Sequence, residues 1–284
     1  NFLKLHWDGV TPLLLGYSGG SDSKALLYAL LETGCKPHLA HVDHGWREES
    51  SAEASLLKKE AETLGLPFHM TRLEKTKGED AARKGRLVFF RGLFQKIPFQ
   101  AFMLAHHAKD LAETVLKRVL EGAHLPSLGG MEEVGMMEGM ALWRPLLSHK
   151  KEEIATFLEE RKLEPLIDST NFDPKYLRAR MRLEILPHIA KLFGKEIEEN
   201  LSLLSKRAFE LKTYLAKKTE GQKLNSDLER LEARYLLIEL AKRKNISINR
   251  VILERALDAM YSHRGKVQIT PSILVDKGQV VIIE

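Results

Sequence analysis

The chain has 284 residues, 44% hydrophobic and 29% charged, a balance typical of globular proteins; no apolar run reaches the roughly 18–20 residues of a membrane span, so we expect no membrane partner. Its single cysteine, Cys35, excludes an internal disulfide and a cysteine-rich metal site and is typical of a reducing compartment, so we expect a cytoplasmic protein. The net charge of +5 is unevenly distributed, because residues 201–284 hold 16 Lys and Arg against 10 Asp and Glu. This excess of positive charge has two about equally favoured explanations, a polyanionic partner and a solvated lysine-rich surface.

Short apolar runs alternate with helical patterns in the first part of the chain. The runs predict strands over residues 12–17, 38–43, 68–73, 101–105 and 140–143, and apolar residues at helical spacing predict helices over 24–32, 53–64, 80–95, 110–120 and 152–161. This alternation predicts an α/β fold over residues 1–190, with a Rossmann-like parallel sheet of about five strands flanked by helices. Ligands bind such sheets at the carboxyl ends of the strands, so a site is expected there.

The pattern changes after residue 187. Helices are expected over residues 197–217, 227–244 and 249–261, and strands over 266–269, 273–275 and 280–283, with a turn at 276–278. The sequence therefore predicts a linker helix within residues 191–217 and a small basic α+β domain over residues 218–284.

A glycine- and serine-rich segment separates the first predicted strand from the first helix. Its two glycines let the backbone approach a ligand closely, and the helix start behind them offers free N–H groups at the positive end of the helix dipole. Serine hydroxyls add donors, so the segment is an anion cradle suited to phosphates. It lacks the lysine of the G-x-x-x-x-G-K-[ST] loop, and similar turns begin many ordinary helices. The segment consists of Ser18, Gly19, Gly20, Ser21, Asp22 and Ser23.

Two further polar segments adjoin the expected ligand edge. His41 and Asp43 end the second predicted strand, beside the first loop, although a polar strand end followed by a turn is common without a ligand. Arg83 and Arg86 share one face of a predicted helix, where paired guanidiniums suit phosphate oxygens and equally suit a solvated surface.

The segment after the fourth predicted strand carries two histidines and two acids. Asp110 and Glu113 lie three residues apart at a helix start, so both project towards one pocket mouth, where they suit an ammonium group or Mg²⁺. Acids near a helix N-terminus also stabilise the helix dipole without any ligand. His106 and His107 are adjacent, but histidines of this kind more often form hydrogen-bonded packing groups than metal sites.

The motifs together resemble a known family. Residues 18–23 match the SGGxDS signature of the PP-loop ATP pyrophosphatases, which cleave ATP between its α- and β-phosphates and adenylate a carbonyl oxygen. Residues 106–114 resemble the H-H-x-D-D-x-x-E-T motif of the tRNA(Ile)-lysidine synthetases, except that Lys109 replaces the first Asp. Ala179 likewise replaces an Asn of that family. Further similar segments, in order, are residues 41–45, 81–86, 121–131, 144–147, 168–171 and 176–187.

The resemblance implies a reaction and a set of residue roles. The family joins L-lysine to C2 of the wobble cytidine in the CAU anticodon of tRNA(Ile), using ATP with Mg²⁺. The resemblance assigns the pyrophosphate to residues 18–23, an amino group of lysine to Asp110 and Glu113, and the lysine carboxylate to Arg178 or Arg182. Asp22 is the candidate Mg²⁺ ligand, and the nucleotide pocket is completed by His41, Asp43, Arg83 and His106.

Contact with tRNA is expected on the basic domain over residues 218–284 and on Lys117, Arg118 and Arg144. Three alternatives stay open. A PP-loop enzyme that inserts sulfur would use cysteine pairs or an iron–sulfur cluster, which one cysteine does not favour. An amidating synthetase would gain little from a basic tail, and a non-catalytic nucleotide- or RNA-binding module would have no use for Asp110 and Glu113.

Overall fold

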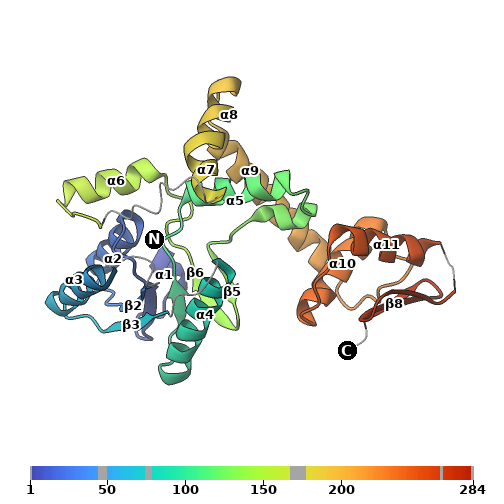
Figure 1. The fold of residues 1–284 in the computed structure, drawn as a ribbon, viewed down its shortest axis with the longest axis horizontal. Coiled ribbons are helices and arrows are strands. Elements are labelled where there is room, and N and C mark those ends of the chain that lie inside the picture. Colours follow the sequence, from blue (N-terminus) through green and yellow to red (C-terminus); the bar gives the residue numbers. More distant parts are fainter. Residues whose placement is uncertain (1, 44–49, 74–78, 167–176, 263–264, 283–284) are drawn as a thin grey trace. The chain divides into compact units, whose positions relative to one another are not determined.

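The computed structural model describes residues 2–43, 50–73, 79–166, 177–262 and 265–282, and the chain divides into two compact units (Figure 1). The first unit comprises Asn1–Glu121 and Gly130–Leu203, and the second comprises Gly122–Gly129 and Leu204–Glu284. Helix α9 (Ile197–Lys218) therefore supplies residues to both units. No helix in the described ranges is long and apolar enough to cross a membrane.

A six-stranded sheet in the order β3-β2-β1-β4-β6-β5 organises the described part of the first unit. Five of its strands run parallel, and these are the five that the sequence predicts. The sixth, β5 (Val134–Met137), pairs antiparallel with β6 at the edge. The α/β fold with a parallel sheet is confirmed. The five parallel strands are β1 (Leu13–Gly16), β2 (His38–Asp43), β3 (Phe68–Arg72), β4 (Ala101–Met103) and β6 (Met140–Trp143).

Helices cover both faces of this sheet, because central strands such as β1 carry apolar side chains on both faces. Leu13, Leu14 and Leu15 are all buried, at 1%, 0% and 0% exposure, because successive side chains of a strand point to opposite faces. Leu13 and Leu15 pack with side chains of α2 (Ser21–Glu32) and α3 (Ser50–Thr63). Leu14 packs on the other face with side chains of α4 (Glu79–Lys96).

The remaining helices of the first unit follow the sheet in chain order. Helix α5 (Ala108–Leu120) begins five residues after β4, and α6 (Lys151–Glu160) follows β6. Three short elements were not predicted: α7 (Leu177–Arg180), a π-helical turn over Met181–Ile185 and α8 (Leu186–Phe193). A short N-terminal helix, α1 (Phe2–His6), packs its Phe2 ring against Trp143 of β6.

The second unit has its own apolar core, built between helices and a small sheet. Helices α10 (Arg230–Arg243) and α11 (Arg250–Tyr261) pack on the antiparallel sheet β7-β8-β9, and Leu237, Leu257 and Ile273 are fully buried between them. The predicted turn is a two-residue hairpin loop, with positive φ at Lys277 (46°) and Gly278 (75°), as a type I′ turn requires. The strands are β7 (Val267–Thr270), β8 (Ile273–Asp276) and β9 (Gln279–Ile282), and a 3₁₀ turn, η1, covers Leu125–Gly129.

Candidate active site

The glycine- and serine-rich segment over residues 18–23, called the phosphate loop from here on, connects the end of β1 to the start of α2. Gly19 has φ +76°, and a Cβ added there would lie 2.5 Å from Leu57 Cδ2, so both its backbone and its surroundings require glycine. The hydroxyls of Ser18 and Ser23 lie 3.1 Å apart, and Ser23 Oγ also donates to the Gly20 carbonyl at 3.1 Å. No side chain caps α2 at Gly20, so the first N–H groups of the helix face the loop.

One half-buried carboxylate, that of Glu60, contacts residues on either side of the phosphate loop. Glu60 of α3 accepts hydrogen bonds from Tyr17 Oη at 2.7 Å and Tyr28 Oη at 3.2 Å, and forms an ion pair of 3.1 Å with Lys24. Burial, and then the Glu60 carboxylate, raise the pKa of Tyr17 well above its usual value, so its hydroxyl stays a donor. Lys24 also donates to the Glu164 carbonyl at 2.8 Å, which connects α2 to the segment after α6.

The end of β2 lies beside the loop, as the sequence predicts. His41 Nδ1 lies 2.9 Å from the Tyr17 carbonyl, and since a carbonyl only accepts, Nδ1 carries the proton. Asp43 is 3% exposed and lies 3.6 Å from the Nε of Arg72. Arg83 lies on α4 with an exposed side chain, and no described contact links it to the loop. Residues 44–45, 168–171 and 176, which also carry the family resemblance, lie outside the described residues.

Helix α5 begins with a histidine–aspartate capping box. The backbone N–H of His107 donates to Asp110 Oδ2 at 3.0 Å, and the backbone N–H of Lys109 donates to His107 Nδ1 at 3.2 Å. Nδ1 therefore accepts, so the neutral ring carries its proton on Nε2. Nε2 lies 3.5 Å from Asp110 Oδ2 and 3.8 Å from Asp22 Oδ2. His107, which the sequence favours as a packing group, thus lies between the phosphate loop and α5.

Asp110 and Glu113 form a compact cluster with Arg178 and Arg182, the two arginines to which the family resemblance assigns the carboxylate of lysine. Arg178 donates from Nε to Glu113 Oε2 at 3.1 Å and from Nη2 to Asp110 Oδ1 at 3.0 Å. Arg182 donates from Nε to Glu113 Oε1 at 2.7 Å and from Nη2 to Asp110 Oδ1 at 2.9 Å. Two buried carboxylates thus face two guanidiniums, and the cluster is neutral overall. All four side chains named by the sequence are brought together.

The ionisation of this cluster follows from its contacts. Burial alone would raise the pKa of Asp110, but His107, Arg178 and the backbone N–H of His107 together hold it below its usual value. Asp110 is therefore ionised at neutral pH. The opposite balance holds at His106, where burial lowers the pKa to about 4, aided by the charges of Arg144 and Arg178. His106 is neutral at pH 7, and its Nδ1 accepts a hydrogen bond from Arg144 Nε at 3.2 Å.

A lysine that the motifs do not single out also reaches the phosphate loop. Lys151 of α6 donates from Nζ to Ser21 Oγ at 2.7 Å and forms an ion pair with Asp22 Oδ1. Its only signal in the sequence is membership of a charged helix start, which is common on protein surfaces. The contact joins residues about 130 positions apart, so nothing local in the sequence reveals it.

Metal binding by protein side chains alone is not favoured. Among the described residues, no three His, Cys, Asp or Glu side chains gather closely enough to hold a metal ion. Asp22, the candidate Mg²⁺ ligand, has a partly exposed carboxylate at the loop. A metal that keeps most of its waters and takes one carboxylate together with substrate phosphates fits this donor set.

Comparison with known proteins shows the family to which the sequence is similar. Residues 3–189 match the family model described as a PP-loop domain. The tRNA(Ile)-lysidine synthase of Protochlamydia amoebophila is 35% identical over 99% of this chain and 67% of its own length, and that of Chlamydia muridarum is 35% identical over 95% of this chain and 91% of its own. Among solved structures, the U34-tRNA thiolase NcsA from Methanococcus maripaludis, with its [4Fe-4S] cluster, superposes with a TM-score of 0.56 at 17% identity, covering 71% of this chain and 72% of that one. That likeness concerns the fold alone.

Proposed function

Because the chain belongs to the PP-loop family and, within it, to the tRNA(Ile)-lysidine synthases, we propose that it joins L-lysine to C2 of the wobble cytidine in the CAU anticodon of tRNA(Ile). The chain is an ATP-dependent ligase that forms a carbon–nitrogen bond. In the proposed reaction AMP is transferred from ATP to the C2 oxygen with release of pyrophosphate. An amine of lysine then attacks C2, loses its proton and displaces AMP.

The observation that carries this proposal is the connection between the phosphate loop and the acid–arginine cluster. The His107 ring lies within 4 Å of both Asp22 and Asp110, so a nucleotide held by the loop and an amino acid held by the cluster would react within one site. The loop holds the pyrophosphate portion of ATP through its hydroxyls and the N–H groups of α2. Asp22 is the side chain that would hold Mg²⁺, which when bound spreads the negative charge of the phosphates.

The acid–arginine cluster suits both charged ends of an amino acid. The ammonium of lysine matches Asp110 and Glu113, and its carboxylate matches a guanidinium through forked hydrogen bonds. Arg178 is the better partner for the carboxylate, because its side chain is 56% exposed whereas that of Arg182 is 29% exposed. The lowered pKa of Asp110 suits a carboxylate that holds a cation rather than one that takes up a proton.

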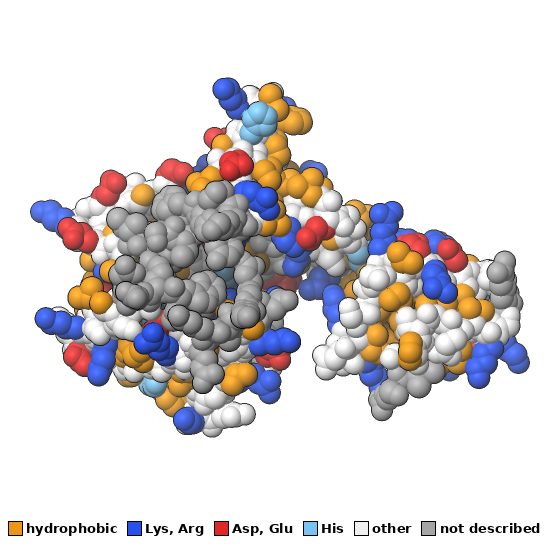
Figure 2. Space-filling view, in the orientation of Figure 1, with side chains coloured by type: hydrophobic (Ala, Val, Ile, Leu, Met, Phe, Trp, Pro, Cys, Tyr) orange, Lys and Arg blue, Asp and Glu red, His pale blue; other side chains and the backbone are white. Residues whose placement is uncertain are grey.

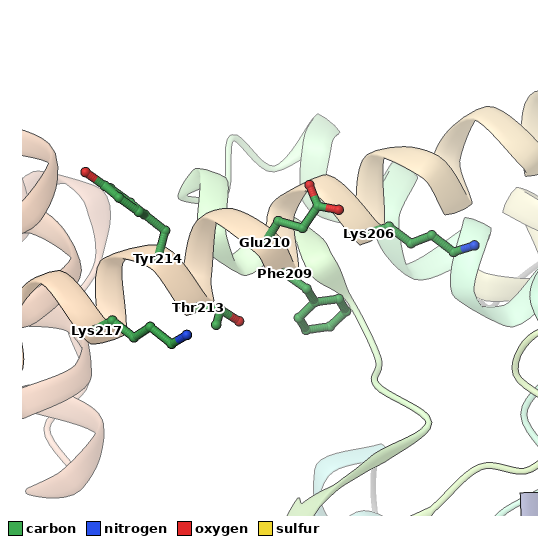
Figure 3. Close-up of a pocket in the computed structure, with 6 residues that line it drawn as sticks. All are labelled: Lys206, Phe209, Glu210, Thr213, Tyr214 and Lys217. Carbon is green, nitrogen blue, oxygen red and sulfur yellow. The ribbon is translucent and has the colours of Figure 1, made fainter.

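Helix α9 supports the proposed tRNA contact better than net charge does. Figure 2 shows Lys and Arg side chains scattered among acidic ones, so charge alone does not outline a face. One stripe of α9 combines lysines with an aromatic ring: Lys206, Tyr214 and Lys217 are exposed, and the Tyr214 side chain projects from the helix (Figure 3). Phe209 beneath this stripe packs against Gly129 in the same unit. Lysines beside an exposed aromatic side chain suit phosphates and unstacked bases of an RNA loop.

A sulfur-inserting alternative gains no support from the cysteine. Cys35 is 1% exposed, and burial raises the pKa of its thiol to about 11, so it is not poised to act as a thiolate. Because Cys35 follows α2 and precedes β2, it lies at the end of the sheet opposite to the phosphate loop.

The test is incorporation of radiolabelled L-lysine into bulk tRNA, with and without ATP. ATP-dependent and lysine-specific labelling of a CAU-anticodon isoleucine tRNA is the expected result. If no label enters tRNA while ATP is still cleaved to AMP and pyrophosphate, the PP-loop chemistry stands, but a different acceptor or nucleophile must be sought.

A further inference from the structure

We propose that Lys151 is a ligand of the ATP phosphates and supplies the cation that the phosphate loop itself lacks; this inference rests on the proposed use of the loop for ATP. The loop contains three serines, two glycines and one aspartate, so its only charged side chain is negative. Phosphate-binding loops of the G-x-x-x-x-G-K-[ST] kind carry a lysine within the motif. In this chain the corresponding charge comes from another helix.

The fold places Lys151 at the loop through ordinary apolar packing. Ile154 and Leu158 of α6 pack against Ala25 of α2 in a small buried cluster, which holds the two helices together (Figure 1). Lys151, Ile154 and Leu158 lie at positions i, i+3 and i+7, so they share one face of α6. The face that binds α2 therefore carries Lys151 towards the start of α2, where the phosphate loop lies.

The contacts of Lys151 leave it able to bind an additional anion. Its ammonium has three donors, of which one goes to Ser21 Oγ and one to Asp22 Oδ1. The side chain is 37% exposed, so its neighbours do not enclose it. A compact ammonium on a flexible stem can follow the phosphates as they move, unlike a fixed backbone donor.

The other cations near the loop are committed elsewhere in the described structure. Lys24, which directly follows the phosphate loop in α2, forms an ion pair with Glu60 and donates a hydrogen bond to the Glu164 carbonyl. Arg178 and Arg182 bind Asp110 and Glu113. Among the lysines and arginines of the described ranges, Lys151 is the one whose charged head contacts side chains of the phosphate loop.

This placement defines what Lys151 does in the reaction. When ATP is split between its α- and β-phosphates, negative charge develops on the leaving pyrophosphate, and a lysine at the loop stabilises that charge. If the Lys151 ammonium moves towards the bound phosphates, it leaves Asp22 Oδ1, which is then free to bind Mg²⁺. Lys151 is thus predicted to distinguish ATP from AMP, because AMP lacks the two phosphates that the loop holds.

The test compares nucleotide binding by K151M, K151R and the matched control K150M. Lys150 is the adjacent lysine, it is exposed, and it pairs with Glu199. Calorimetry without tRNA or lysine is expected to show that K151M raises the Kd for ATP by about 10- to 100-fold, the effect of losing one hydrogen bond to a charged group. The Kd for AMP should change less than three-fold, K151R should recover most of the ATP affinity, and K150M should match the wild type.

Two results would overturn the assignment: an unchanged Kd for ATP in K151M, or an equal loss of ATP and AMP affinity, which would indicate a general disturbance of the loop. Far-ultraviolet circular dichroism and the Tm of each variant identify any failure to fold, and K151R then decides the case. Because binding is measured without tRNA and lysine, the outcome is independent of the proposed ligation. A wild-type enzyme that binds ATP and modifies no tRNA would remove the proposed function and leave the role of Lys151 standing.

Discussion

Replacing Gly19 with alanine tests the geometry of the phosphate loop. At φ +76° an alanine costs roughly 1–2 kcal/mol in backbone strain. The new Cβ would also lie 2.5 Å from Leu57 Cδ2 and 2.8 Å from Leu166 Cδ1, and overpacking of this kind typically costs about 1–3 kcal/mol. We therefore expect G19A to lower the free energy of unfolding by about 2–5 kcal/mol, and the Tm by roughly 4–20 °C for a unit of this size.

Gly34 provides the matched control, because it has nearly the same backbone and different surroundings. Its φ is +82°, and among the described residues no atom lies within 4 Å of the position that a Cβ would take. G34A should therefore cost only the backbone strain, about 1–2 kcal/mol. The difference between the two variants isolates the contacts with Leu57 and Leu166.

The assay is urea unfolding of both variants, followed by calorimetric titration with ATP. G19A is expected to lose more stability than G34A and also to weaken ATP binding, because relieving the contact displaces the loop. G34A should bind ATP as the wild type does. Equal destabilisation by the two substitutions, or normal ATP binding by G19A, would refute the close packing of the loop described above.

Three further predictions follow from the site and from α9. D110N should raise the KM for lysine at least ten-fold and change the Kd for ATP less than two-fold; an equal loss of both would contradict the role of Asp110 in holding lysine. Because the pKa of His106 is lowered to about 4, the unfolded state binds its proton more readily, so stability is lost as pH falls from about 6.5 to 4. Urea unfolding of H106Q should show a shallower loss over that window, and an unchanged slope would exclude this cause. Charge reversal of Lys206 and Lys217 together should weaken tRNA binding and reduce its dependence on log salt by about 1.5–2, whereas reversal of exposed Lys59 on α3 should not.

The fold could be predicted where the sequence pattern and burial agree. The three consecutive leucines of β1 form the short apolar run of a strand that is buried on both faces, and the helices beside it have apolar residues at helical spacing. The type and the order of these elements could therefore be predicted from the sequence. Strand β5 was missed because it is a partly exposed edge strand, in which Val134 and Met136 point to solvent and burial leaves little pattern. The region of α7 and α8 was missed because its helices are short and interrupted by a π-helical turn.

The sequence predicted that the phosphate loop and the start of α5 lie at the same edge of the sheet, but it did not predict how their side chains pair. The rule that ligands bind at the carboxyl ends of parallel strands placed the phosphate loop, His41, His106 and Asp110 at one edge of the sheet without any distance being known. Which acid faces which base depends on tertiary packing. The contact of Asp22 with Lys151 requires α6 to lie on α2, and the position of His107 depends on its capping role in α5. No residue spacing in the sequence predicts the Asp22–Lys151 contact or the position of the His107 ring.

These pairings form a continuous chain of charged and hydrogen-bonding side chains across the site. Lys151 contacts Asp22, the ring of His107 lies between Asp22 and Asp110, and Asp110 binds both arginines of the cluster. A change of charge at one end therefore alters the balance at the other, since each carboxylate shares its neighbours. When phosphates draw Lys151 away, Asp22 gains capacity for another cation, while Ser21 Oγ at 3.5 Å and His107 Nε2 at 3.8 Å remain beside its carboxylate. The two halves of the proposed reaction, activation of the base by ATP and attack by lysine, thus draw on one set of charges, and the buried ring of His107, at 2% exposure, lies in the middle of it.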